Sequence, residues 1–389
     1  MASSLAGFAA NNGMRLYGGS RGASEWITGA ADPDAWGRTA RREVRIGLAI
    51  PLSGLTGIWG PSALASAKLA AAELNQASGV GGRLCRLVPI DADDHASHVE
   101  PTLSALVAAG EVDAIVGMHT SFVRQRILAA VGGEIPYVYT PLYEGGEATP
   151  GVFAIGETPA RQLQPAIAWL VQHERQPRRW ALLGNDYVWP HASNRLARGY
   201  LAERSAEVVS EQYVPLGTTD YGEILAGLKR NRADAVLLSL VGNDAIEFNR
   251  AFGAEQLMGR MLRLSAAIEE NELLAIGAEN TERLYVASSY FSTLTTDANL
   301  SFKERYHGHF GERAPTLNSL GQSTYEGVHF LASLFERGLV ARERWAEAGR
   351  EPIAYRSARE GTYKGNGMNL APVYLAVADG HVFRVLTRL

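Results

Sequence analysis

The sequence predicts an α/β protein made of two doubly wound lobes, each a parallel sheet covered by helices on both faces. Three observations lead to this prediction. Short apolar runs alternate with helical patterns along the chain, which is typical of parallel sheets. The alternation restarts near Arg161, where a second unit of the same kind begins. The chain has 389 residues, which is long for one hydrophobic core and ample for two.

The first lobe is expected to begin at Val44. The run VRIGLAI is apolar and β-branched and stops at Pro51, which suits a buried parallel strand. A helical pattern follows and ends in a glycine-rich turn. The later strands of this lobe are expected in CRLVPIDADD (85–94), VDAIVGM (112–118), IPYVYTP (135–141) and GVFAIG (151–156).

The second lobe repeats this rhythm and ends in a hairpin. Asp379-Gly380, between two strand-like runs, is a strong hairpin signal. We expect several chain crossings between the lobes, with a ligand cleft between them. The expected strands are RRWALLGND (178–186), EVVSEQYVP (207–215), ADAVLLSLVG (233–242), MLRLSAA (261–267) and ERLYVASSYF (282–291). The predicted division is an N-terminal extension (1–43), a first lobe (44–157 and 288–352) and a second lobe (158–287 and 353–389).

Composition excludes several classes of protein. The net charge of −4 and the pI near 6.2 provide no positive field for nucleic acid. Cys85 is the only cysteine, so neither an intrachain disulfide nor a cysteine-based zinc site can form. No apolar stretch approaches membrane-spanning length, and MASSLAGFAANNGMRLYGG lacks the pattern of a secretory signal. The sequence therefore predicts a cytoplasmic protein that binds neither membrane nor nucleic acid.

Motifs for catalysis and for metal or phosphate binding are absent from the sequence. There is no P-loop, no G-x-S-x-G nucleophile elbow and no H-E-x-x-H. DADDHASH (91–98) groups three acids with two histidines, but without the spacing of a metal site, so a polar loop with a helix cap is favoured. We therefore expect no catalytic residue, no metal and no cofactor, and we do not expect an enzyme.

Four predicted strands end in polar or aromatic residues. These ends are His119-Thr120-Ser121, Tyr139-Thr140-Pro141, Asp186-Tyr187-Val188-Trp189 and Gly242-Asn243-Asp244. Ligands of open α/β sheets bind beyond the carboxyl ends of the strands. Hydroxyls and phenols suit a small neutral polar ligand, and no Lys or Arg stands there to pair with an anion, although a helix N-terminus can also bind one. The alternatives are that Tyr187 and Trp189 only pack in the core and that Ser121 only caps a helix.

The stretches IGLAIPLSGLTG, YTPLYEG, GNDYVWPHASN and SSYFS give the chain a family resemblance. From Val44 almost to its end, the chain resembles the type I periplasmic-binding-protein fold. Within that fold it is similar to the amide- and urea-binding branch, which includes amide-sensing negative regulators of amidase operons. Trp189 stands where those regulators have a tyrosine, and Ala266 and Ala267 stand where they have threonines, which implies a different or larger amide. The resemblance implies ligand-binding roles for Ser121, Tyr139, Thr140, Pro141, Tyr187 and Trp189.

The main functional hypothesis is a cytoplasmic sensor that closes two lobes on a short-chain aliphatic amide or a urea-like ligand. By resemblance, it would regulate an amidase operon through a protein partner, an antiterminator or a transcription regulator, and we expect a homodimer. The alternative is the solute-binding component of an ABC transporter for amides, urea or amino acids. An amide hydrolase is a third hypothesis, but it needs a nucleophile with an orienting base, and neither is evident.

Overall fold

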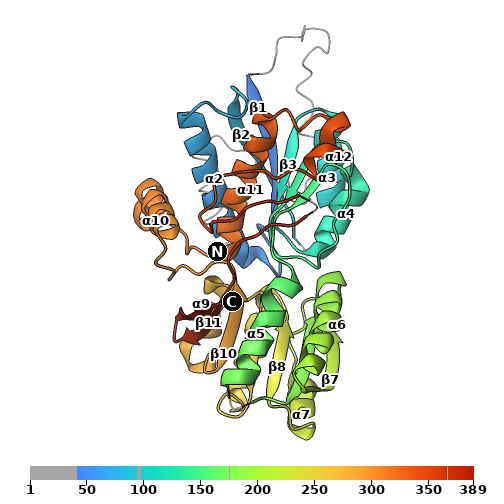
Figure 1. Ribbon diagram of the computed structural model, residues 1–389, viewed down its shortest axis with the longest axis vertical. Coiled ribbons are helices and arrows are strands. Elements are labelled where there is room, and N and C mark those ends of the chain that lie inside the picture. Colours follow the sequence, from blue (N-terminus) through green and yellow to red (C-terminus); the bar gives the residue numbers. More distant parts are fainter. Residues whose placement is uncertain (1–41, 94–97, 175, 366) are drawn as a thin grey trace.

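The computed structural model describes residues 42–93, 98–174, 176–365 and 367–389. These residues form two lobes, one above the other in Figure 1, each with a central sheet flanked by helices. The predicted architecture of two wound α/β lobes is therefore confirmed. Within these described ranges, no helix is both long and apolar enough to cross a membrane.

The first lobe has a five-stranded sheet in the order β2-β1-β3-β4-β5, and every neighbouring pair is parallel. The strands are β1 (Glu43–Ile50), β2 (Leu84–Asp91), β3 (Ala114–Gly117), β4 (Tyr137–Tyr139) and β5 (Val152–Ala154). The helices are η3 (Gly57–Trp59), α2 (Gly60–Gln76), α3 (Val99–Ala108), α4 (Ser121–Val131), α10 (Asp297–Phe310), η5 (Gly311–Arg313), α11 (Ser319–Glu336), η6 (Arg342–Arg344) and α12 (Trp345–Ala348).

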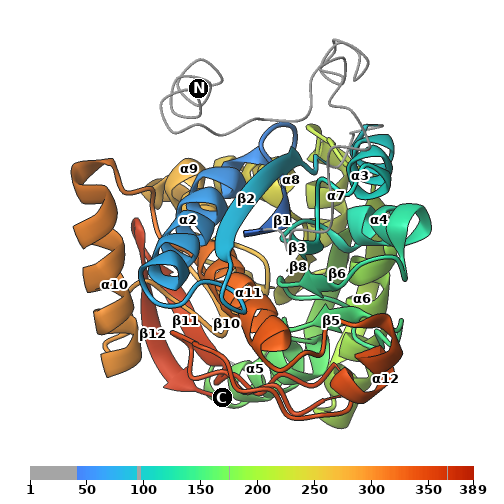
Figure 2. The same ribbon diagram turned by 90° about the horizontal axis from the view of Figure 1, so that it is seen from above.

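Strand β1 shows why this sheet is buried on both faces. Ile46 and Leu48 point into the core formed with α2 and α11, whereas Ala49 points into the core formed with α3 and α4. Successive side chains of a strand alternate between its two faces, so an almost continuous apolar run fits a sheet covered on both sides. Viewed from above, α2 and α11 lie on one side of this sheet and α3 and α4 on the other (Figure 2).

The second lobe has a seven-stranded sheet in the order β12-β11-β10-β9-β8-β6-β7. Its strands are β6 (Arg179–Asn185), β7 (Glu207–Val214), β8 (Ala235–Ser239), β9 (Leu262–Ser265), β10 (Leu284–Ser288), β11 (Tyr374–Asp379) and β12 (Val382–Arg388). Its helices are α5 (Pro159–His173), α6 (Val188–Glu203), α7 (Gly222–Arg230), α8 (Gly242–Ala254), α9 (Glu270–Ile276) and η4 (Ala278–Asn280).

The two strands at the C-terminal end of the chain close this sheet in antiparallel fashion. Strands β6 to β10 pair in parallel, whereas β11 runs antiparallel to β10 and to β12. Asp379 pairs with Val382, so Gly380 and His381 form a two-residue turn, with Gly380 at φ +63°. The hairpin predicted from Asp379-Gly380 is confirmed, because such turns need the left-handed backbone that glycine adopts readily.

Three chain segments cross between the lobes: residues 155–158, 289–296 and 349–373. The third segment packs largely on the first lobe. Ile353 and Tyr363 form a bridge and belong to the first-lobe core, where the Tyr363 ring lies 5.1 Å from that of Phe330. The sequence prediction places residues 353–389 in the second lobe. In the structure, residues near Ile353 and Tyr363 pack on the first lobe instead, because Tyr363 contacts aromatic rings of that lobe, and the chain reaches the second-lobe sheet only at β11.

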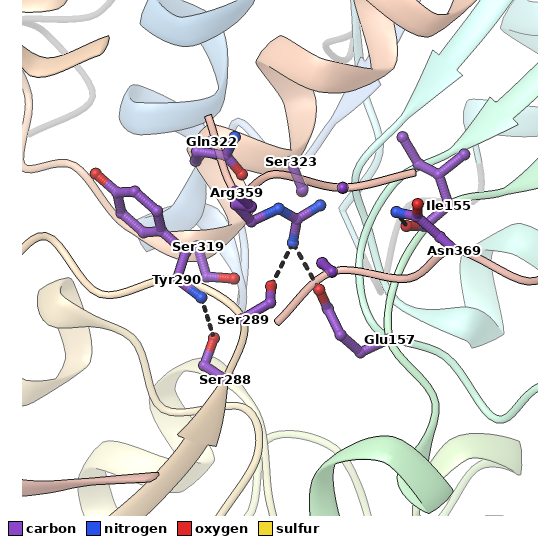
Figure 3. A network of polar contacts seen from close by, with 12 residues as sticks. Ile155, Glu157, Ser288, Ser289, Tyr290, Ser319, Gln322, Ser323, Arg359 and Asn369 are labelled. Atoms are coloured by element: carbon purple, nitrogen blue, oxygen red, sulfur yellow. Dashed lines mark hydrogen bonds and ion pairs between the residues drawn. The ribbon is translucent and has the colours of Figure 1, made fainter. Parts of the chain in front are cut away.

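The three crossings meet at one buried arginine, Arg359. Its guanidinium donates to Glu157 Oε1 at 2.8 Å on the first crossing and to Ser289 Oγ at 2.6 Å on the second (Figure 3). It also donates to Glu326 Oε2 of α11 at 2.8 Å. The Arg359 side chain is 0% exposed. We call Arg359, Glu157, Ser289 and Glu326 the hinge cluster, because it joins all three crossings at one point.

Candidate ligand-binding site

A cavity lies between the two lobes. The cavity volume is about 20 Å³, close to the room that a single water molecule needs. The first lobe contributes Trp59, His119, Thr120, Ser121, Tyr139, Pro141, Leu142 and Leu320, and the second contributes Tyr187, Trp189, Val241 and Ala267. Its walls are therefore aromatic and aliphatic with few polar groups, as in many small-molecule sites.

Five of the six predicted ligand-binding residues line this cavity: Ser121, Tyr139, Pro141, Tyr187 and Trp189. Thr140 does not. Its hydroxyl lies 3.4 Å from Gly117 O and 3.3 Å from Ser323 Oγ, inside the first lobe. The reason is the alternation of an extended chain: Tyr139 faces the cavity, so the next side chain points away.

Five helices begin at the cavity wall, among them α2, whose N-cap is Trp59. Ser121 is the first residue of α4, and Tyr187 and Val241 precede α6 and α8 as their N-caps. Leu320 lies in the first turn of α11. The first N–H groups of a helix lack partners within the helix and carry partial positive charge. The helix N-termini therefore place partial positive charge at the cavity wall from both lobes, although no Lys or Arg lines the cavity.

His119 is neutral and fully committed to the wall. Its Nδ1 lies 3.1 Å from Thr120 O, and its Nε2 lies 2.9 Å from the Tyr137 hydroxyl oxygen. A carbonyl oxygen can only accept, so Nδ1 carries the proton and Nε2 accepts from Tyr137. Burial lowers the pKa of His119 to about 4, so the ring is uncharged at neutral pH. Tyr139 in turn donates its hydroxyl to His119 O at 2.7 Å.

Ser121 is held by a buried ion pair. Its hydroxyl donates to Glu144 Oε2 at 2.6 Å, and Glu144 pairs with Arg124, which also pairs with Glu147. A carboxylate bound to a guanidinium is an acceptor, so the only hydroxyl proton of Ser121 is used in this contact. The lone pairs of Ser121 Oγ remain, and Ser121 can serve the cavity only as an acceptor.

Trp189 carries the opposite chemistry. Its indole Nε1–H is buried and has no hydrogen-bond partner among the described residues. A buried donor without an acceptor is costly, so such a group in a cavity wall suits a ligand acceptor. Sequence analysis places Trp189 on a strand, but β6 ends at Asn185 and Trp189 stands in the first turn of α6. The Tyr187 and Trp189 rings, 6.4 Å apart, still form one wall.

The fourth predicted strand end does not reach the cavity through its polar residues. Asp244 accepts hydrogen bonds from Asn185 Nδ2 at 2.5 Å and from Gly217 N, which fastens loops within the second lobe. Trp59 and Leu320 are cavity residues that the sequence analysis missed. A tryptophan in the turn after the first strand is a signal that could have identified Trp59. No comparable sequence signal marks Leu320 as a cavity residue, because it lies in α11, far along the chain from the strand ends that form the rest of the wall.

The lobes touch directly beside the cavity. Trp59 Nε1 of the first lobe donates to Glu272 Oε1 of the second. Ser319 N donates to Glu269 Oε2 at 2.7 Å, and Asn271 Nδ2 donates to Ile58 O at 3.0 Å. We call Glu269, Asn271 and Glu272, together with these partners, the latch. It joins the second lobe to cavity-lining segments of the first.

A sequence model of one family, described as periplasmic binding protein, matches residues 43–380. The chain belongs to the periplasmic binding protein family. This finding supports the family resemblance inferred from the sequence, whereas the closer likeness to amide-sensing regulators remains a prediction.

Solved periplasmic binding proteins share this two-lobe fold at low sequence identity. A solute-binding protein of an ABC transporter from Rhodopseudomonas palustris HaA2, in complex with p-hydroxybenzoic acid, has a TM-score of 0.80 and 18% identity over 89% of this chain and 97% of that one. A periplasmic binding protein from Burkholderia mallei has a TM-score of 0.79 and 18% identity over 90% and 95%.

A third similar structure comes from Streptococcus pneumoniae. It is a branched-chain amino acid transporter substrate-binding protein in complex with isoleucine, with a TM-score of 0.76 and 17% identity over 89% of this chain and 100% of that one. At such identities the likeness concerns the fold.

Proposed function

We propose that this protein binds a small organic solute in the cavity between its lobes and serves as the solute-binding component of an ABC transporter. Two lobes joined by three crossings can close on a ligand, and a ligand favours closure by as much as it prefers the closed form. The similar proteins from Rhodopseudomonas palustris HaA2 and Streptococcus pneumoniae, one holding p-hydroxybenzoic acid and the other isoleucine, support a transport role.

The cavity chemistry favours a neutral ligand with a donor and an acceptor close together. The observation that carries this proposal is the buried Trp189 Nε1–H, which has no acceptor among the described residues. Ser121, whose proton is committed to Glu144, requires a donor from the ligand. A ligand carboxylate has no hydrogen to donate, so its oxygens would face the acceptor oxygen Ser121 Oγ without forming a hydrogen bond. A carboxamide or urea provides C=O for Trp189 and N–H for Ser121.

The aromatic walls favour a ligand with a planar or apolar body. Trp59, Tyr139, Tyr187 and Trp189 surround the cavity, and Ala267 is a small apolar residue of its wall on the side of the second lobe. Aromatic side chains provide large contact areas for apolar groups at little loss of conformational freedom. We therefore propose an amide with an apolar body, with its polar end between Ser121 and Trp189.

Calorimetric titration with matched pairs tests this proposal. The pairs are benzamide with benzoate and propionamide with propionate, with urea and isoleucine added. We expect the amide of each pair to bind at least about tenfold more tightly than its acid, because the acid leaves Ser121 Oγ facing a like acceptor. Tighter binding of the acids, or of isoleucine, would overturn the ligand class and leave an anion or amino acid at the helix N-termini.

The second candidate is a cytoplasmic amide sensor that acts through an antiterminator or transcription regulator as a homodimer. The neutral, amide-compatible cavity favours it, since the same site would serve either role. Cell fractionation separates the two candidates. Protein outside the cytoplasmic membrane supports the transport role, whereas amide-binding protein in the cytosol supports the sensor.

A further inference from the structure

The latch acids Glu269 and Glu272 form a cluster of buried acids with their neighbour Glu270. Glu269, Glu270 and Glu272 are 3%, 5% and 0% exposed, respectively. In the part of the chain that the structure describes, no salt bridge joins any of them to a basic side chain. Buried carboxyl groups normally pair with a cation or stay protonated, because an isolated charge is costly in a dry interior. The cluster therefore requires an explanation beyond packing.

Two of these acids span the boundary between the lobes. Glu269 accepts from Ser319 N of α11 at 2.7 Å, and Glu272 accepts from Trp59 Nε1. Glu272 also accepts from Glu269 N at 3.2 Å, which completes a capping box at the start of α9. Separation of the lobes would break the contacts to Ser319 and Trp59 and admit water to both carboxyl groups. Glu270 differs, because it accepts from Ser292 N on the second crossing.

The charged and titratable groups around the cluster do not neutralise it. Glu157 approaches from the first crossing, but its own carboxylate is paired with Arg359. Lys303 of α10 lies on the side of Glu270 and donates to Ser292 O. Arg250 of α8 donates to Ala275 O at the far end of α9. Tyr290 lies near Glu270 and is neutral, because burial raises the pKa of its hydroxyl well above the ordinary value.

We infer that the lobes close with uptake of protons at Glu269 and Glu272, so that acid favours the closed form. Burial raises the pKa of Glu272 to about 7 and that of Glu269 well above its ordinary value. In an open form both carboxyl groups meet water and return toward ordinary values. Between about pH 4.5 and 7 the closed form therefore holds protons that the open form releases, and rising pH favours opening.

This inference rests on the closing motion of the proposed function but not on the identity of the ligand. It is therefore tested on the ligand-free full chain by energy transfer between dyes on the two lobes. Glu134 of the first lobe and Arg195 of the second are exposed, so Glu134→Cys and Arg195→Cys in a Cys85→Ser background provide the attachment sites. We expect transfer to fall from pH 5 to pH 8. The closing equilibrium should change by up to about tenfold per pH unit for each linked proton.

Three variants test whether Glu269 and Glu272 are the groups that make lobe closure depend on pH. Glu269→Gln with Glu272→Gln keeps the acceptor oxygens but removes the titrating groups, and it should abolish most of the pH dependence. Asn271→Ala is the matched control, because it weakens the latch without changing a charge and should lower closure equally at every pH. Trp59→Phe removes the donor that helps to hold Glu272 ionised, so it should move the midpoint to higher pH.

Two results would overturn the inference. One is transfer that stays constant from pH 5 to pH 8 in the parent protein, and the other is an unchanged pH dependence in the double glutamine variant. Neither depends on ligand binding. If benzamide still binds in calorimetry while transfer is flat, only the proton linkage fails. If transfer follows pH as expected but no amide binds, the ligand proposal fails instead.

Discussion

The hinge cluster and the latch both bury carboxyl groups between the lobes, but only the hinge cluster supplies a cation. Arg359 donates to Glu157 and Glu326 at 2.8 Å each. Burial alone would lower the pKa of Arg359, but the two carboxylates raise it above its ordinary value. The guanidinium therefore stays charged at every pH at which the protein folds. In the latch, Glu269 and Glu272 have only neutral donors.

This difference indicates two mechanical roles. A buried ion pair with complete hydrogen bonds has one favoured geometry, and removal of one partner is costly. The hinge cluster can therefore fix the point about which the lobes move. A buried carboxyl group with a neutral donor can exchange that donor for water, so the latch can open.

Loss of the Arg359 guanidinium should strongly destabilise the folded protein. Arg359→Met leaves Glu157 and Glu326 buried without a cation, and we expect the free energy of unfolding to fall by about 3–5 kcal/mol. Urea unfolding at pH 7 measures this loss. Arg230→Met is the control, because Arg230 pairs with Glu223 on the surface at 3.6 Å, and its loss should cost less than about 1 kcal/mol. Equal losses in both variants would remove the distinction between the hinge cluster and an ordinary surface pair.

Glu270, the buried acid next to the latch, should respond in the opposite direction. Burial raises the pKa of Glu270 to about 7 from an ordinary value of 4.5. A raised carboxyl pKa contributes stability that is complete below pH 4.5 and is lost as pH rises to about 7. Glu270→Gln keeps an acceptor for Ser292 N without the charge, so it should stabilise the protein at pH 8 by on the order of 3 kcal/mol.

The same variant should show little gain at pH 4.5, where the parent carboxyl group is already protonated. Urea unfolding at both pH values gives this comparison. A variant less stable than the parent at pH 8 would show that Glu270 is ionised and well paired, as the acids of the hinge cluster are.

The smallest effect is expected at Thr140, which lies between the cavity and α11. Thr140→Val removes only the long contacts to Gly117 O and Ser323 Oγ, so it should cost about 1 kcal/mol or less of unfolding free energy. Because the side chain points away from the cavity, ligand affinity should stay within about twofold of the parent. Calorimetry with benzamide checks this, and a large loss of affinity would place Thr140 in the site after all.

Local patterns in the sequence predict the lobes and most of the cavity wall. The run VRIGLAI alternates correctly between two cores, and Tyr187 lies two residues after the end of β6, near the strand end as expected. Such features depend on neighbouring residues and on the rule that parallel strands end at one edge of a sheet. Trp189 lies at the cavity as expected but in a helix and not on a strand, because α6 already begins at Val188 and Pro190 fits within its first turn.

Contacts between distant segments could not be predicted in this way. In the hinge cluster, Arg359 contacts Glu157, which lies 202 positions earlier in the sequence, and Ser289, which lies 70 positions earlier. Nothing near Arg359 in sequence marks it as buried. The latch is similar, since Trp59 and Glu272 lie 213 positions apart. Only the packed lobes bring these side chains together, so the sequence alone gives neither the pairing nor its energetic cost.

We propose that Trp189 and Ser121 together recognise a neutral ligand that bears an N–H group and a carbonyl oxygen. Calorimetric titration of the parent protein and Trp189→Phe with benzamide at pH 7 tests it most directly. The variant keeps an aromatic wall but loses the indole donor, so we predict about tenfold weaker benzamide binding than in the parent, in which benzoate should bind at least about tenfold more weakly than benzamide. Equal benzamide affinity in both proteins, or benzoate binding to the parent as tightly as benzamide, would show that Trp189 and Ser121 do not select a neutral amide.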